Sequence, residues 1–148
     1  MICLFKSFNL LPASDSEENN WIIPITISYP ELPGSEVTTF WLKEKSAPLE
    51  MEAKPYLLNY GAAGYYRVDY DEENWKALTQ SLKTKKHINR LNRAQLINDV
   101  MNLARSSHVS YDIALDLLLY LRLEDDYIPW EAAFKALEFV ESRMEASE

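Results

Sequence analysis

Few side chains in this sequence could bind a metal. Zinc hydrolysis needs ligands that converge on the ion, commonly two histidines four residues apart on one helical face with a glutamate between them. The two histidines, His87 and His108, stand 21 positions apart. Asp112 follows His108 by four positions, but Ser110 is expected to cap the helix between them and to leave His108 outside it. The histidines are therefore interpreted as polar residues at element ends, and neither metal nor cofactor is expected in this chain.

The remaining reactive residues also lack the surroundings that catalysis needs. The single cysteine, Cys3, has no histidine near it in the sequence to activate its thiol. The pair Gly61 and Gly64 lacks the count and the strand-to-helix context of a phosphate-binding loop, so it predicts a turn. Solvation and helix capping explain the acidic clusters, which are residues 15–18, 71–73 and 124–126. No catalytic residue is predicted.

Length and composition are typical of one globular domain or two small ones. The chain has 148 residues, of which 47% are hydrophobic and 26% charged. Subtracting 23 acidic from 15 basic residues gives a net charge of −8. No clustered Lys/Arg face that would bind nucleic acid is expected. The longest apolar run, residues 113–123, is interrupted by Asp116 and Arg122, so no membrane-spanning segment is predicted, and no compartment is assigned.

The first part of the chain is predicted to form strands. Residues 21–29 are rich in β-branched and aromatic types, with Pro24 indicating an edge or a bulge. A turn over 30–34 leads to a second strand over 36–42. Residues 56–70 are interpreted as a β-hairpin whose turn is 60–64.

After residue 70 the hydrophobic period changes to that of helices. The first helix is expected to start at Asp71 and to bury Trp75, Leu78 and Leu82. The other three are expected to start as follows: at a capping box of Asn92 and Gln95, at the cap Ser110, and at Pro129. The second helix should bury Leu96, Ile97, Val100, Met101, Leu103 and Ala104. The third is apolar nearly all round, so it should have neighbours on several sides.

These elements predict an α+β fold: a partial antiparallel β-sandwich followed by antiparallel α-helical pairs, the start of an α-solenoid. The domains are expected to be 21–70 for the sandwich portion and 71–148 for the helical portion, with 1–20 as a poorly fitting N-terminal segment. A sheet of this size leaves unpaired edges and the helices have no terminal cap. Both ends are therefore expected to be cut from something longer.

Six segments of the sequence, taken in order, resemble the zinc aminopeptidases of the aminopeptidase N kind, which are gluzincin metallopeptidases. These segments are residues 21–25, 40–42, 59–71, 74–75, 92–99 and 126–130. The most specific are Gly-Tyr-Tyr-Arg-Val-Asp-Tyr-Asp from Gly64, Asn-Arg-Ala-Gln-Leu from Asn92, and Tyr-Ile-Pro-Trp from Tyr127. The resemblance extends from about Trp21 to Met144.

The resemblance implies a place inside a larger enzyme that removes N-terminal residues from peptides. Those enzymes have a β-rich N-terminal domain, a zinc-binding catalytic domain, a small β-sandwich and a helical C-terminal domain. This chain is similar to the later sandwich strands and the first helices of the C-terminal domain. The family is often found at the cell surface or outside the cell, and sometimes in the cytoplasm.

The family's catalytic motifs are not found in this sequence. It contains no His-Glu-x-x-His zinc motif and no Gly-x-Met-Glu-Asn segment for the substrate's amino group; residues 50–53 only echo the latter. The resemblance therefore implies a non-catalytic fragment, inactive alone, whose partner is the catalytic domain of a parent peptidase. Zinc and the peptide substrate would be bound through that parent. The alternative is a small helical protein-interaction module that binds a protein partner through sheet edges or open helical faces.

Four charged residues are candidates for a polar network between the sandwich and the helices. They are Arg67, Asp71, Arg93 and Asp99. Long or charged side chains leaving a strand end can satisfy the free groups of helix termini. The alternative is that each of them is solvated.

Overall fold

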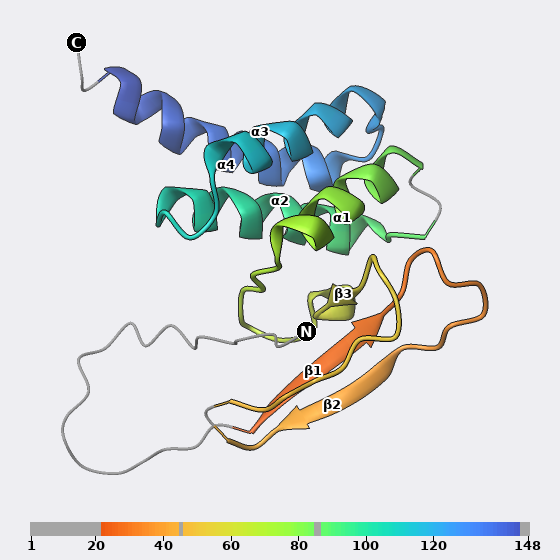
Figure 1. The fold of residues 1–148 in the computed structure, drawn as a ribbon. Helices are drawn as coiled ribbons and strands as arrows, with labels where there is room; N and C mark the ends of the chain where they lie inside the picture. Colours follow the sequence, from red (N-terminus) through yellow and green to blue (C-terminus); the bar gives the residue numbers. More distant parts are fainter. Residues whose placement is uncertain (1–21, 45, 85–86, 146–148) are drawn as a thin grey trace, which may run out of the picture.

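The computed structural model describes residues 22–44, 46–84 and 87–145, which form a small sheet beneath a layer of helices (Figure 1). Strands β1 (Ile23–Ser28), β2 (Thr38–Leu42) and β3 (Leu57–Leu58) form an antiparallel sheet in the order β2-β1-β3. The helices are α1 (Glu72–Thr84), α2 (Arg90–Arg105), α3 (Tyr111–Leu118) and α4 (Tyr127–Glu145). Short 3-10 helices are η1 (Tyr60–Ala62) and η2 (Leu119–Leu123). The fold is α+β, as predicted.

Strand β1 lies in the middle of the sheet and alternates between its two faces. Ile25 and Ile27 are buried in the hydrophobic core, which is the period-2 pattern of a strand with one covered face. Only Ile27 and Ser28 pair with β3. Beside Pro24, no strand of the described residues pairs with that edge of β1, and the Pro24 carbonyl accepts a hydrogen bond from the Tyr66 hydroxyl at 2.9 Å. The proline thus lies where no ladder N–H is needed on that side.

The hairpin predicted over 56–70 is wrong in its second half, because residues 65–70 form no strand. Asn59 has a left-handed backbone, with φ 59°, and its side chain closes the turn. Gly64 N donates to Asn59 Oδ1 at 2.8 Å, while Asn59 Nδ2 donates to the carbonyls of Gly64 and Tyr66. Side chains therefore bind the backbone groups that a second strand would have used.

Helices α1 and α3 begin where the sequence predicts. Asp71 precedes α1 and its Oδ1 accepts from Asn74 N at 3.0 Å. Ser110 caps α3 through a hydrogen bond from Ile113 N. Both contacts satisfy one of the free N–H groups of a helical first turn.

Helix α2 begins earlier than predicted, and the predicted capping box of Asn92 and Gln95 is wrong. Its N-cap is Asn89, whose Oδ1 accepts from Asn92 N at 3.0 Å. Asn92 and Gln95 thus lie inside the helix, and their side chains are free to contact the sheet side of the molecule. Helix α4 begins at Tyr127, two residues before the predicted Pro129, because Asp126 Oδ1 accepts from Ile128 N.

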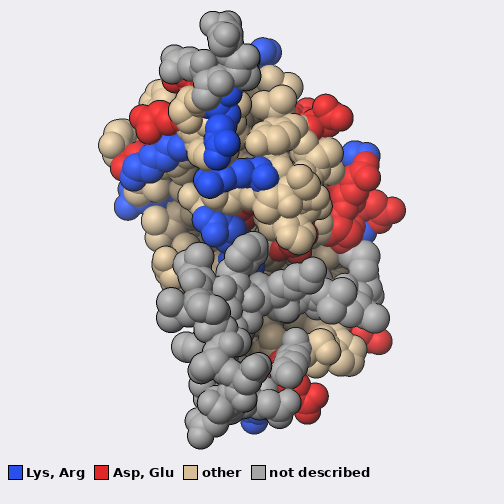
Figure 2. Space-filling view, turned by 90° about the vertical axis from the view of Figure 1, so that its left-hand side faces the viewer, with Lys and Arg blue, Asp and Glu red and all other residues tan. Residues whose placement is uncertain are grey.

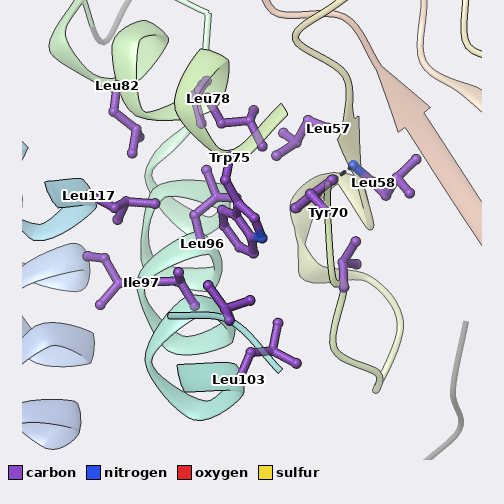
Figure 3. Close-up of a cluster of buried hydrophobic side chains, with 14 of the residues drawn as sticks. Leu57, Leu58, Tyr70, Trp75, Leu78, Leu82, Leu96, Ile97, Leu103 and Leu117 are labelled. Atoms are coloured by element: carbon purple, nitrogen blue, oxygen red, sulfur yellow. Dashed lines mark hydrogen bonds between the residues drawn. The ribbon is translucent and has the colours of Figure 1, made fainter. Parts of the chain in front are cut away.

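One hydrophobic cluster includes the inner face of the sheet and the helices above it (Figure 3). The fully buried Trp75 of α1 has Tyr70 against its ring at 4.9 Å in an edge-on arrangement. Leu57 and Leu58 of β3 lie on the sheet side of this cluster near Tyr70, and Leu96 of α2 lies on the helical side. The buried face predicted for α2 is confirmed: Leu96, Ile97, Val100, Met101, Leu103 and Ala104 are all buried. Each such large side chain contributes about 1.5–3 kcal/mol by leaving water.

Helix α3 and η2 have a partly open apolar face. Leu115, Leu119 and Leu123 are 50%, 52% and 52% exposed, while Leu117 is fully buried. Helix α3 contacts both α1 and α2, so the prediction of neighbours on several sides is met for part of its surface within the described residues. Figure 2 shows Lys and Arg side chains running down one face of the molecule, with Asp and Glu side chains to either side. None of the described helices is both long and apolar enough to cross a membrane.

Candidate functional site: the polar joint between the sheet and the helices

Two of the four predicted network residues, Arg67 and Asp99, lie together. Arg67 follows Tyr66 in the segment 65–70, and Asp99 lies in the middle of α2. Arg67 Nε is 3.8 Å from Asp99 Oδ1, and Arg67 Nη2 donates to Asn98 Oδ1 at 3.3 Å. The arginine side chain is 43% exposed while that of Asp99 is 4% exposed. A half-solvated cation thus contacts a buried carboxyl on the neighbouring helix.

The carboxyl of Asp99 joins α2 to the segment that leads out of the sheet. Its Oδ2 accepts from the backbone N of Val68 at 3.2 Å and from Gln95 Nε2 at 3.3 Å. Burial disfavours the charged form and raises the pKa of Asp99 to about 7, although these hydrogen bonds and Arg67 act in the opposite direction. Val68 is itself buried, so its N–H depends on this acceptor.

Asp71 lies at the start of α1 and contacts a different part of the sheet side. Its Oδ2 accepts from the Tyr56 hydroxyl at 2.9 Å, and its Oδ1 accepts from Lys54 Nζ at 3.1 Å. Burial alone would raise the pKa of Asp71, but the Tyr56 hydroxyl, the Asn74 N–H and Lys54 together hold it below its ordinary value. Asp71 therefore caps a helix and binds the segment before β3 at the same time.

The structure does not bring Arg93 to the sheet. Its Nε and Nη2 donate to the two carboxylate oxygens of Glu124 at 2.7 and 3.1 Å, and its Nη1 donates to the carbonyl of Ile88. This bidentate ion pair links α2 to the segment between η2 and α4, inside the helical layer. The acidic cluster 124–126 was interpreted as solvated or capping, and for Glu124 that is corrected: its side chain has no exposed surface.

Side-chain amides that no sequence pattern singles out make many of the contacts between the sheet and the helices. The Asn74 amide pairs with the backbone of Tyr56: Tyr56 N donates to Asn74 Oδ1 at 3.1 Å, and Asn74 Nδ2 donates to the Tyr56 carbonyl at 2.9 Å. Both residues are fully buried. An amide that accepts and donates in one plane takes the place of a neighbouring strand. Next along the chain, Leu58 N donates to the Tyr70 hydroxyl at 3.0 Å.

Asn92 has the largest number of these contacts in the described structure. Its Oδ1 accepts from Gly61 N and from Asn89 Nδ2, both at 2.8 Å. Its Nδ2 donates to the Asn59 carbonyl at 3.1 Å and to Gln95 Oε1 at 2.8 Å. Asn92 is completely buried, so it uses all its hydrogen-bonding capacity within the protein. The only sequence signal was the pair of amides three residues apart, which fits a helix cap equally well.

We call these residues the sheet–helix joint, defined as Tyr56, Asn59, Arg67, Tyr70, Asp71, Asn74, Asn92, Gln95 and Asp99. Its polar groups form hydrogen bonds with one another and with the backbone. These bonds fix the positions of the sheet and the helices relative to each other. Among the described residues, no group of three or more His, Cys, Asp or Glu is placed to hold a metal ion.

A cavity of about 300 Å³ lies between α1 and α3, and no residue of the joint lines it. Glu72, Lys76, Asp112 and Asp116 contribute its charged lining, and Lys76 Nζ lies 2.6 Å from Glu72 Oε1. No histidine or cysteine lines it. Its only cation is thus already paired with a carboxylate of the same helix.

Comparison with known proteins finds relatives that are all aminopeptidases. A sequence model described as the ERAP1-like C-terminal domain matches residues 55–148. Aminopeptidase N of Plutella xylostella is 38% identical over 135 residues, 86% of this chain and 14% of that protein. Aminopeptidase N of Homo sapiens and aminopeptidase Ey of Gallus gallus are each 38% identical over 133 residues, 86% of this chain and 13% of each relative.

The chain thus spans about one seventh of the length of the curated relatives it matches. The matched region contains α1, α2, α3, α4 and every residue of the sheet–helix joint. The chain belongs to the ERAP1-like C-terminal domain family and is an aminopeptidase N-type family member.

Proposed function

We propose that this chain is a non-catalytic part of an aminopeptidase N-like zinc metallopeptidase, in which it holds the first helices of the C-terminal domain against the β-sandwich. The observation that carries the proposal is the sheet–helix joint. Asn74, Asn92 and Asp99 come from helices and bind main-chain groups of residues 56–68. These contacts leave the sheet and the helices little freedom to move apart.

The same proposal includes inactivity of the chain alone. Peptide hydrolysis by this family implies zinc, and the sequence contains neither the His-Glu-x-x-His motif nor the amino-group segment. Zinc and the peptide substrate would be held by a catalytic domain of the parent enzyme, which would be the partner of this chain. The division into 21–70 and 71–148, with 1–20 apart, is part of this proposal.

The test is an assay of the purified 148-residue chain on aminoacyl p-nitroanilides, with and without added zinc. We expect no release of nitroaniline above buffer and far less than one zinc per chain by elemental analysis. A full-length aminopeptidase N is the positive control. Turnover that accompanies about one bound zinc per chain would contradict the proposal.

A second candidate is a helical protein-interaction module. The observation in its favour is the row of half-exposed leucines on α3 and η2, namely Leu115, Leu119 and Leu123. The two candidates differ in the size of the native polypeptide detected in source tissue by an antibody to residues 70–148. A band several times larger than 17.2 kDa supports the enzyme part, whereas a band at 17.2 kDa supports the module.

A further inference from the structure

A buried carboxyl at the sheet–helix joint faces a cation that has a second partner. Asp99 and Asn98 are neighbours on α2, and Arg67 contacts both: Nε lies 3.8 Å from Asp99 Oδ1, and Nη2 donates to Asn98 Oδ1 at 3.3 Å. The arginine side chain is 43% exposed. It can therefore lose one of these contacts without being left unsolvated.

The two carboxyl oxygens of Asp99 have different partners. Oδ2 accepts from Val68 N and Gln95 Nε2, while Oδ1 faces Arg67. A proton on Oδ1 would leave Oδ2 an acceptor and would put an O–H donor opposite a guanidinium that has only donors. Protonation therefore removes the Arg67 contact and leaves the Val68 contact in place.

We propose that Asp99 is a proton-operated latch on the sheet–helix joint. With the carboxyl ionised, Arg67 is held between Asp99 and Asn98 and fastens the segment 65–70 to α2. With the carboxyl protonated, Arg67 keeps only Asn98 and water, and the segment is held through the backbone of Val68. The inference rests on the proposed function only where it concerns a larger enzyme. There, the contact between the helices and the sheet would depend on pH.

The groups that act on Asp99 account for a transition near neutral pH. Burial raises the pKa of Asp99 to about 7; Arg67 lowers it, and the nearby negative charge of Asp69 raises it further. The charge of Asp99 also acts on Tyr66, whose own pKa is raised to about 12, chiefly by burial. Tyr66 is therefore neutral throughout the range in which the latch works, and the proton goes to Asp99.

The experiment is an NMR titration of the uniformly labelled chain between pH 5 and 9. It follows the side-chain carboxyl carbon of Asp99 and the Nε of Arg67. We expect both signals to move with one midpoint near pH 7. A carboxyl midpoint below pH 5, or an Arg67 Nε that does not follow it, would overturn the proposal.

Two variants separate the latch from a general pH effect. In Asp99→Asn the Arg67 signal should lose its response, whereas in Asp116→Asn, an exposed acid on α3, the response should persist. If Asp99→Asn does not fold, Arg67→Gln serves instead and should raise the Asp99 midpoint, because the cation that favours the ionised form is gone. An unmoved midpoint would contradict the proposal. Because these readouts follow proton binding, failure of the latch is distinct from failure of the proposed function, which the zinc and activity assay tests.

Discussion

Asn92 and Asn59 lie 33 positions apart in the chain, and the side-chain Nδ2 of Asn92 donates to the backbone carbonyl of Asn59 at 3.1 Å. The same Asn92 accepts from Gly61 N at 2.8 Å, so the first turn of α2 binds two residues with positive φ in the turn after β3. Both asparagines are buried. An uncharged side chain thus helps to fix α2 over the sheet, together with the carboxyl of Asp99, which binds Val68 N.

Asn92→Ala is expected to lower the free energy of unfolding by about 2–4 kcal/mol, because it leaves the Gly61 N–H and the Asn59 carbonyl without their partner. Urea denaturation followed by circular dichroism measures this loss. The control is Gln80→Ala, which removes an exposed side-chain amide on α1 and should change the free energy by no more than about 0.5 kcal/mol. Equal losses in the two variants would contradict the role of Asn92.

Glu124→Gln is expected to destabilise the chain by about 3–5 kcal/mol at pH 7, because it leaves the buried guanidinium of Arg93 without a counter-charge. Burial alone would raise the pKa of Glu124, but Arg93 and the N–H groups of Asp125 and Asp126 hold it below its ordinary value. A lowered pKa in the folded state stabilises the fold above the ordinary pKa. That contribution is lost as pH falls through the folded value.

The control for Glu124 is Glu131→Gln, which breaks the exposed pair with Lys135 on α4. Exposed pairs of this spacing contribute about 0.3–0.5 kcal/mol, so little change is expected. Denaturation at pH 7 compares the two variants, and measurements below pH 4.5 follow the loss of the Glu124 contribution. A Glu124→Gln chain as stable as the control would show that the buried pair adds nothing.

The free energy of unfolding of the Asp99→Asn variant is expected to rise relative to that of the unsubstituted chain as pH rises. The pKa of Asp99 is raised to about 7 in the folded state, so the folded chain binds the proton more tightly than the unfolded chain does. The stability from that proton is fully present below the ordinary pKa and is lost as pH rises through 7. Between pH 5 and 8 the difference should change by about 2–3 kcal/mol. Parallel pH profiles of the two proteins in urea denaturation would refute this.

Arg67→Ala is expected to lower the melting temperature by about 1–3 °C, because the half-exposed guanidinium contributes little more than a surface pair. The effect should be larger at pH 8 than at pH 5.5, since Asp99 is ionised only at the higher pH. Differential scanning calorimetry at both values measures it. An unchanged melting temperature at pH 8 would mean that Arg67 is merely solvated.

The helices could be predicted because local signals determine them. Trp75, Leu78 and Leu82 recur at helical spacing and are all buried, and Ser110 caps α3 as its position suggests. Residues 65–70 could not be predicted, because their aromatic and β-branched composition favours a strand. Asn59 and Asp99 take up the backbone groups that a strand would have paired.

The joint could be predicted only in its charged members. Charge and position in the sequence made Asp71 and Asp99 candidates for a polar network, and the structure places both at the joint. Arg93 has the same character but binds Glu124, 31 residues later in the chain, a pairing that no local pattern indicates. The amides of Asn74 and Asn92 were missed because an asparagine near a helix start is usually a cap, and tertiary contact alone distinguishes the two uses.

The hydrogen bonds of residues 56–68 also determine how their amide protons exchange with solvent. The N–H groups of Tyr56, Leu58, Gly61 and Val68 donate to side chains of residues 70–99, not to another strand. Such protons can exchange with deuterated water only when those side chains withdraw. The exchange rates of these sheet-side amides would then measure how often the helical layer lifts away from the sheet.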